Sequence, residues 1–153
     1  MRTTFSLRIV LPSVWIGLLL GLSFIEPTLK FQAPGITIPL GLGIGRLVFW
    51  AMSICGWLLL LTLTALAFRA PRVGRGPAVL IGVLWIVLLV QTIGIRPALS
   101  ARSDVIIAGG DPGDSILHYV YIGTDVALLG LLVALLVMSI RALPLTAAAS
   151  ERR

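Results

Sequence analysis

Residues that build most metal and catalytic sites are scarce in this chain of 153 residues. It contains one cysteine and one histidine, and only 12% of its residues are charged. The lone cysteine, Cys55, cannot form an intrachain disulfide, and with His118 it cannot supply the three or four protein ligands of a zinc site. The sequence therefore predicts no metal centre and no cofactor, and it argues against an enzyme without excluding one.

Hydrophobic residues are abundant instead. They make up 58% of the chain, and the mean hydropathy is +1.08, outside the usual range of soluble domains. Apolar runs cover residues 9–26, 47–68, 76–95 and 116–140, each close to the roughly 20 helical residues that a hydrocarbon core requires. The runs lack the alternating pattern of barrel strands. We predict a single all-α domain, an antiparallel bundle of four transmembrane helices.

The arginines predict the orientation of this bundle, because positive residues next to membrane spans stay on the cytoplasmic side. Lys30, Arg46, Arg96 and Arg102 would lie outside, together with most of the acids. We therefore expect both termini in the cytoplasm and the protein in the plasma (inner) membrane, with the bilayer as its main partner. The inside would hold the other basic residues: Arg2, Arg8, Arg69, Arg72, Arg75, Arg141, Arg152 and Arg153.

Two alternative functions of the basic residues are less favoured. The arginines are dispersed at helix ends rather than gathered on one soluble face, so no nucleic-acid partner is expected. Arg2 and Arg8 precede an apolar run, as in a secretory signal. The length of the run and the missing small-residue cleavage site favour retention as the first span, whereas cleavage would leave three spans.

Glycine and proline predict how the helices are joined and packed. Gly17 and Gly21 form a G-x-x-x-G step, which lets another helix approach closely; we expect that neighbour within this chain, with a second copy as the alternative. Prolines and glycines in residues 27–46 oppose a long helix. This stretch is expected to lie at the membrane interface or to cover the bundle, with a flexible approach to the second span.

A polar stripe in the last span is the strongest candidate for a site. His118, Tyr121 and Asp125 fall within roughly 60° of one helical face, and Asp125 lies about 10 Å deeper than His118. A charge near the bilayer centre costs about 2.5 to 3.5 kcal/mol on insertion scales. Candidate partners at the same membrane level are Arg46, Arg96, Gln91, Thr92 and Glu26.

Two interpretations of this stripe stay open. In the structural one, Arg46 or Arg96 pairs with Asp125 and holds the last helix in the bundle through charge-assisted hydrogen bonds. In the functional one, the stripe lines a water-filled pocket that binds a cation or small solute, or relays protons through His118 and Asp125.

Short motifs along almost the whole chain resemble a bacterial four-helix membrane family of unknown function related to transmembrane protein 205. The resemblance implies a four-span membrane protein, with an animal relative linked to drug resistance and trafficking, and implies no reaction. His118 and Pro97 are its landmarks, while the glycine-rich approach to the second span and Asp125 depart from the pattern. The motifs are Trp15, Ile16 and Gly17, then Glu26 and Pro27, then Ile95, Arg96 and Pro97, then Leu117, His118 and Tyr119.

Three classes of function follow. Short loops favour a non-catalytic membrane protein that supports the cell envelope or a larger membrane complex, as a homo-oligomer or with another membrane protein. The alternative is a transporter of ions or small solutes that uses the stripe in the last helix. A lipid- or quinone-handling enzyme is the weakest, since one histidine and one aspartate underspecify a catalytic site.

Overall fold

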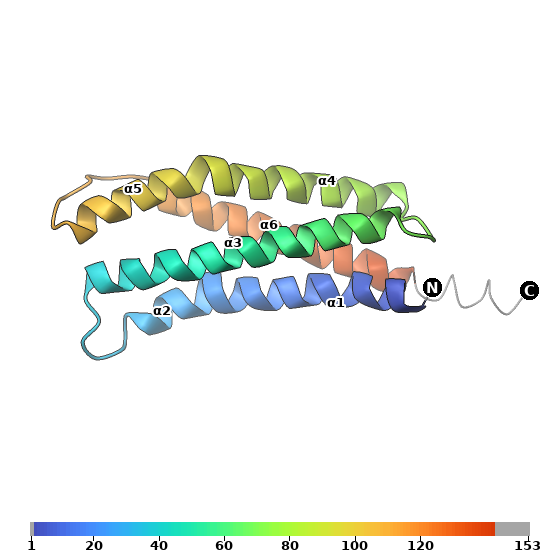
Figure 1. Ribbon diagram of the computed structural model, residues 1–153, viewed down its shortest axis with the longest axis horizontal. Helices are drawn as coiled ribbons and strands as arrows, with labels where there is room; N and C mark the ends of the chain where they lie inside the picture. Colours follow the sequence, from blue (N-terminus) through green and yellow to red (C-terminus); the bar gives the residue numbers. More distant parts are fainter. Residues whose placement is uncertain (1, 143–153) are drawn as a thin grey trace, which may run out of the picture.

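The computed structural model describes residues 2–142, which form four long helical rods (Figure 1). Arg152 and Arg153, which were expected to mark the cytoplasmic side, lie outside the described residues. The prefix η marks a π-helix, in which N–H groups bond five residues back rather than four. In chain order the elements are α1 (Arg2–Leu19), η1 (Leu20–Ile25), α2 (Glu26–Lys30), α3 (Ile38–Phe68), α4 (Arg75–Leu89), η2 (Val90–Ile95), α5 (Arg96–Ile107) and α6 (Leu117–Arg141).

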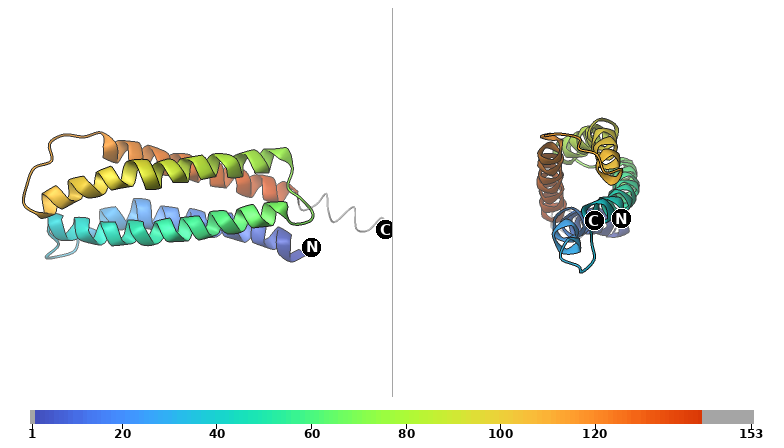
Figure 2. Two further views of the ribbon diagram at one scale, coloured as in Figure 1. Left: turned by 45° about the horizontal axis from the view of Figure 1, so that its top comes forward. Right: turned by 90° about the vertical axis from the view of Figure 1, so that its left-hand side faces the viewer.

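The rods form an up-and-down bundle. Successive rods run antiparallel, and α6 returns beside α1, so the four close around one core (Figure 2). We call one end the turn end, because it holds the short turn 69–74, the start of α1 and the end of α6. The other end, with the connections 31–37 and 108–116, is the loop end. The predicted all-α antiparallel bundle is thus confirmed.

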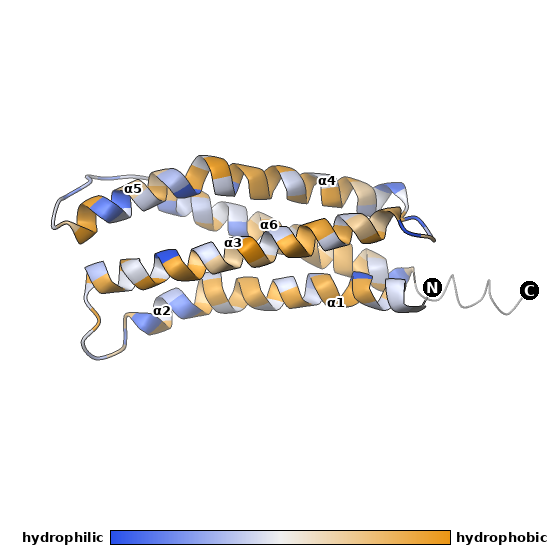
Figure 3. Cartoon of the chain, viewed as in Figure 1, coloured by the Kyte–Doolittle hydropathy of each residue, from blue (hydrophilic) through white to orange (hydrophobic). Residues whose placement is uncertain are grey.

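Each rod is long and apolar enough to cross a bilayer. The continuous helical stretches are Thr3–Lys30, Ile38–Phe68, Arg75–Ile107 and Leu117–Arg141. Their outward surfaces are apolar as well: Leu47 is 71% exposed, Trp50 67% and Phe68 75%, and hydrophobic colour covers most of the rods (Figure 3). Soluble monomers rarely expose so much contiguous apolar surface.

The core is a set of seams with alternating spacings of three and four residues, as in coiled coils and helix bundles. On α6 the buried residues are Tyr121, Asp125, Leu128, Leu132 and Leu135. On the third rod they are Ile81, Leu84, Leu88, Gln91 and Ile95. Asp125 and Gln91 therefore occupy regular core positions, and the spacing that buries the leucines buries them too.

The rods are longer than the predicted spans, most clearly in the second rod. α3 begins at Ile38 rather than near residue 47, so the expectation of an irregular segment across residues 27–46 is wrong for most of that stretch. Pro39 lies in the first turn, where its missing N–H would have no partner in any case. The Thr37 hydroxyl caps this turn by accepting a hydrogen bond from the Leu40 N–H.

Glycine serves close packing in α3 rather than in α1. A Cβ added at Gly41 would lie 2.3 Å from the Phe31 ring, and one at Gly56 would lie 3.3 Å from the Trp15 ring. At Gly17 and Gly21 an added Cβ meets nothing within 4 Å. The expectation that Gly17 and Gly21 pack against a helix of this chain is therefore wrong, because both lie off the buried face of α1.

The two π-helices repeat one device in the two halves of the chain. Each has six residues and precedes an isoleucine-x-proline step, at Pro27 and at Pro97. The N–H of Glu26 bonds the Gly21 carbonyl, and the N–H of Arg96 bonds the Gln91 carbonyl, both five residues back. Proline has no N–H to donate and clashes in a regular helix, so the wider turn lets each rod continue past it.

Candidate functional site

Asp125 and Gln91 meet inside the bundle, towards the loop end. The Gln91 amide nitrogen donates to the Asp125 carboxylate at 2.7 Å and to the Thr124 hydroxyl at 2.8 Å. Gln91 is 0% exposed and Asp125 2%. This contact ties η2 to α6 through a buried carboxylate, which is costly to bury unless donors reach it.

Arg96 joins three rods immediately beside this pair. From the first turn of α5, its guanidinium donates to the Phe49 carbonyl of α3 at 2.7 Å and to the Tyr121 hydroxyl of α6 at 3.0 Å. It also lies over the Tyr121 ring, 5.6 Å from its centroid, and the Phe49 and Tyr121 rings meet edge to face. We call Gln91, Arg96, Tyr121, Thr124 and Asp125 the core polar cluster.

Arg96 stands near Asp125 without pairing with it directly. The two attract each other electrostatically, yet among residues 2–142 the ion pairs are Lys30 with Glu26 and Arg46 with Asp104. The predicted Arg–Asp125 ion pair is therefore absent from the described residues, because the guanidinium is already bound by the Phe49 carbonyl and the Tyr121 hydroxyl. An amide takes its place on the carboxylate.

The first rod reaches the core polar cluster through η1. The Ser23 hydroxyl interacts with the Asp125 carboxylate and lies 3.4 Å from the Met52 sulfur. Asp125 is thus contacted from both π-helices, by Ser23 of η1 and Gln91 of η2. π-Helical turns inside longer helices are frequent at functional sites, so the paired arrangement makes this the candidate site.

Some hydrogen-bonding capacity in this region is unused. Within the described residues, no partner reaches the buried Gln91 Oε1, Thr92 Oγ1 or Arg96 Nε. Buried polar atoms are usually satisfied. The cluster therefore has room for additional polar contacts with a small bound species or a transferred proton.

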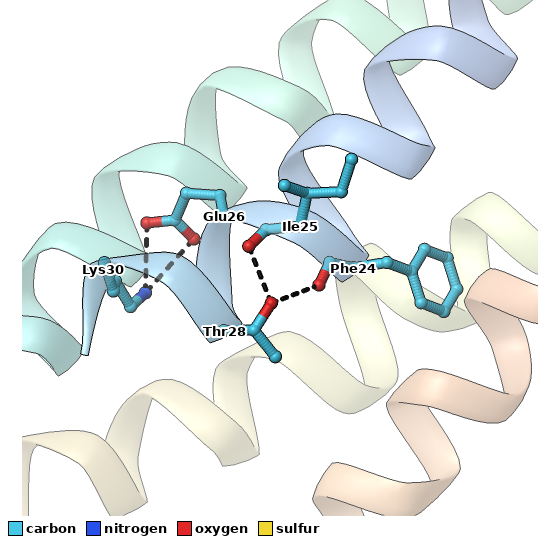
Figure 4. Close-up of polar contacts among 5 residues, drawn as sticks. All are labelled: Phe24, Ile25, Glu26, Thr28 and Lys30. Carbon is cyan, nitrogen blue, oxygen red and sulfur yellow. Dashed lines mark hydrogen bonds and ion pairs between the residues drawn. The ribbon is translucent and has the colours of Figure 1, made fainter. Parts of the chain in front are cut away.

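Glu26 and Arg46 were candidates for this cluster but lie elsewhere. Glu26 pairs with Lys30 one turn further along α2, beside the Thr28 hydroxyl that donates to the Phe24 and Ile25 carbonyls (Figure 4). Arg46 pairs with Asp104 of α5 in an exposed position. Both cations have acids nearer to them than Asp125, so neither is drawn inward.

His118 also lies apart from the buried residues. It has the same register on α6 as Tyr121 and Asp125, but its side chain is exposed and its ring neighbours that of Tyr119. His118 is in the first turn after the 108–116 connection, where the neighbouring rods no longer cover this face. The predicted stripe is thus buried only from Tyr121 inward.

Sequence reasoning missed Thr124, Ser23 and the carbonyl of Phe49. Thr124 was detectable, since it adjoins Asp125 and has a hydroxyl at the same level. The pairing of Gln91 with Asp125 was also detectable, because each continues a core seam of its rod. The Phe49 carbonyl left no signal, since any residue provides a carbonyl and only the packing of α5 on α3 exposes this one to Arg96.

The core polar cluster is chemically suited to two tasks. Its cross-rod hydrogen bonds fix the relative position of all the rods it touches, and its carboxylate could exchange a proton or hold a small cation. A metal centre of several protein ligands is not indicated, as no group of three or more His, Cys, Asp or Glu side chains gathers in the described residues. No family model, curated protein or solved structure matches this chain.

Proposed function

We propose that this chain is a non-catalytic, multi-pass protein of the plasma (inner) membrane that serves as a structural or accessory component of the envelope or of a larger membrane complex. The four apolar rods and their lipid-compatible outer surface support the membrane location. Membership of the family related to transmembrane protein 205 stays a prediction that rests on short motifs.

The charge distribution supports termini on the cytoplasmic side. At the turn end, Arg69, Arg72, Arg75 and Arg141 border the rods, whereas the described acids other than Asp125 lie towards the loop end. Positive residues flanking spans are retained in the cytoplasm. The turn end would therefore face inward.

The observation that carries the structural role is the engagement of Arg96. Its guanidinium bridges a carbonyl of α3 and a hydroxyl of α6 while its backbone belongs to α5. Charge-assisted hydrogen bonds of this kind are stronger than neutral ones. The polar side chains of the core are thus used mainly to hold rods together, which suits a rigid scaffold with an apolar exterior that another membrane protein can cover.

The accessory role predicts a stable partner in native membranes. Tagged protein extracted in a mild detergent should co-purify with one membrane protein, or with a second copy of itself, in a constant ratio. The ratio should survive Arg46→Gln, since Arg46 lies outside the core polar cluster and its exposed pair with Asp104 contributes little. A single species of monomer mass from native membranes would contradict the proposal.

Transfer of protons or small cations is a second candidate, and one observation favours it. Asp125 accepts from a neutral amide rather than from an arginine, and it lies between two π-helices at matching positions of the two halves. Interrupted spans at matching positions of two repeats mark the binding site in many transporters. An acid inside a membrane is a functional candidate by default.

Asp125→Asn separates the two candidates. Asparagine keeps an oxygen that accepts from Gln91 but removes the charge, so the fold should survive with a loss of less than about 1 kcal/mol in the free energy of unfolding. If Asp125 transfers protons or cations, flux into proteoliposomes measured with an internal pH- or cation-sensitive dye should be abolished. Asp104→Asn, which removes an exposed acid, is the matched control. Wild-type flux that persists in Asp125→Asn would eliminate the transport candidate.

A further inference from the structure

A pocket of about 250 Å³ lies at the turn end, far from the core polar cluster. Its walls come from all four rods and from the turn 69–74, and most of its lining is apolar, including Phe5, Leu63, Ile81, Leu135 and Met138. An engineered apolar cavity of about 150 Å³ is large enough to bind benzene. The pocket therefore has room for a segment of hydrocarbon chain.

Arg8 lines the same pocket and is 8% exposed. Its Nη2 donates to the carbonyls of Leu66, Arg69 and Pro71 at the end of α3, at 2.5, 3.1 and 2.9 Å. Its Nε is buried and without a partner in the described part of the chain. Arg8 thus caps α3 with one nitrogen, while part of its hydrogen-bonding capacity stays free.

The charge of Arg8 is not balanced by any acid nearby. Residues 2–25, 47–103 and 126–142, which include all the elements of the turn end, contain no Asp or Glu. Arg72 also lines the pocket, with its side chain exposed. A buried cation bound only by neutral carbonyls is stabilised by an anion, so the site combines an apolar interior with an unmet demand for negative charge.

We propose that this pocket binds an acidic membrane phospholipid, with the phosphate on the Arg8 guanidinium and part of one acyl chain among the apolar side chains. The proposal rests on the membrane location proposed above, because the four rods end at this level and lipid headgroups would lie beside Arg8 and Arg72. A basic pocket between transmembrane helices on the cytoplasmic side is a known way of binding acidic headgroups.

The test compares lipids of equal chain length on purified full-length protein in a neutral detergent. Phosphatidylglycerol should raise the melting temperature and remain bound in native mass spectrometry, whereas phosphatidylcholine should do neither. Arg8→Gln should weaken phosphatidylglycerol binding about tenfold, the loss of one charge-assisted contact. Arg75→Gln removes an exposed arginine of the same end that does not line the pocket, and it should bind like wild type.

A second pair of variants tests the pocket without altering charge or the cap on α3. Ser139→Phe places a ring in the pocket and should abolish lipid binding. Ser13→Phe, at an exposed serine that likewise bonds the carbonyl four residues back, should have no effect. Each shift is measured against the melting temperature of the same variant without lipid, so a change in stability alone is recognised.

Several outcomes would overturn the lipid site. Equal binding of both lipids, unchanged binding in Arg8→Gln or Ser139→Phe, or binding of a free fatty acid in place of the phospholipid would each do so. Lower stability of Arg8→Gln with a full lipid shift would mean that Arg8 only caps α3. Failure of the membrane proposal is distinct, because the chain would then leave the membrane fraction in alkaline carbonate.

Discussion

Gln91→Leu is expected to lower the free energy of unfolding by roughly 3 kcal/mol, measured by sodium dodecyl sulfate titration in mixed micelles. The substitution removes the amide that donates to the Asp125 carboxylate at 2.7 Å. Asp125 is 2% exposed, so water cannot replace this donor without opening the bundle. Leucine is close in size to glutamine, so little of the loss should come from packing.

The double variant Gln91→Leu with Asp125→Leu should recover most of this loss. Replacing both partners of a buried hydrogen bond with apolar groups is often nearly neutral, whereas removing one leaves the other unsatisfied. Gln32→Leu, which alters an exposed glutamine between α2 and α3, is the matched control and should change little. Strictly additive effects of the two single substitutions would show that the contact contributes nothing to stability.

Trp15→Ala should lower the free energy of unfolding by about 3 to 5 kcal/mol in the same assay. Trp15 is 1% exposed and belongs to the core cluster that joins α1, α3, α4 and α6. Its ring lies against Gly56 of α3, where a Cβ would come within 3.3 Å. Alanine would leave a void that the neighbouring helices cannot fill, because Gly56 offers no side chain to move into it.

Trp50→Ala provides the matched control for this void. Trp50 lies on the same bundle but is 67% exposed on the outer surface, where detergent or lipid fills the space left by its ring. Its effect should stay within about 0.5 kcal/mol, as for other surface substitutions. Equal losses for the two variants would mean that the core of α1 is not packed as described.

The apolar runs were sufficient to predict the rods and their antiparallel order. Their ends were harder to predict, since proline and glycine have different effects in different settings. Pro39 starts α3, and Pro27 and Pro97 are passed by π-helical turns. In sequence each of these prolines suggests a break, and only the hydrogen-bonding pattern around it shows whether the helix stops.

The candidate site was predicted in part. Asp125, Tyr121, Gln91 and Arg96 were named from their level in the membrane, and the structure brings them together. His118 shares their register but lies beyond the cover of neighbouring rods. Depth along a helix follows from residue number, whereas the choice of partner depends on which side chains meet across the bundle.

By itself, the sequence determined that this chain forms four apolar helices with the described arginines biased towards one end, because helix length and hydropathy are local properties. Tertiary structure alone decided that Asp125 faces an amide rather than an arginine, that Gly56 and not Gly17 is a close contact, and that Arg8 caps α3 beside a pocket. Each of these depends on how one helix is rotated against another. That rotation is set by the packing of all four rods together.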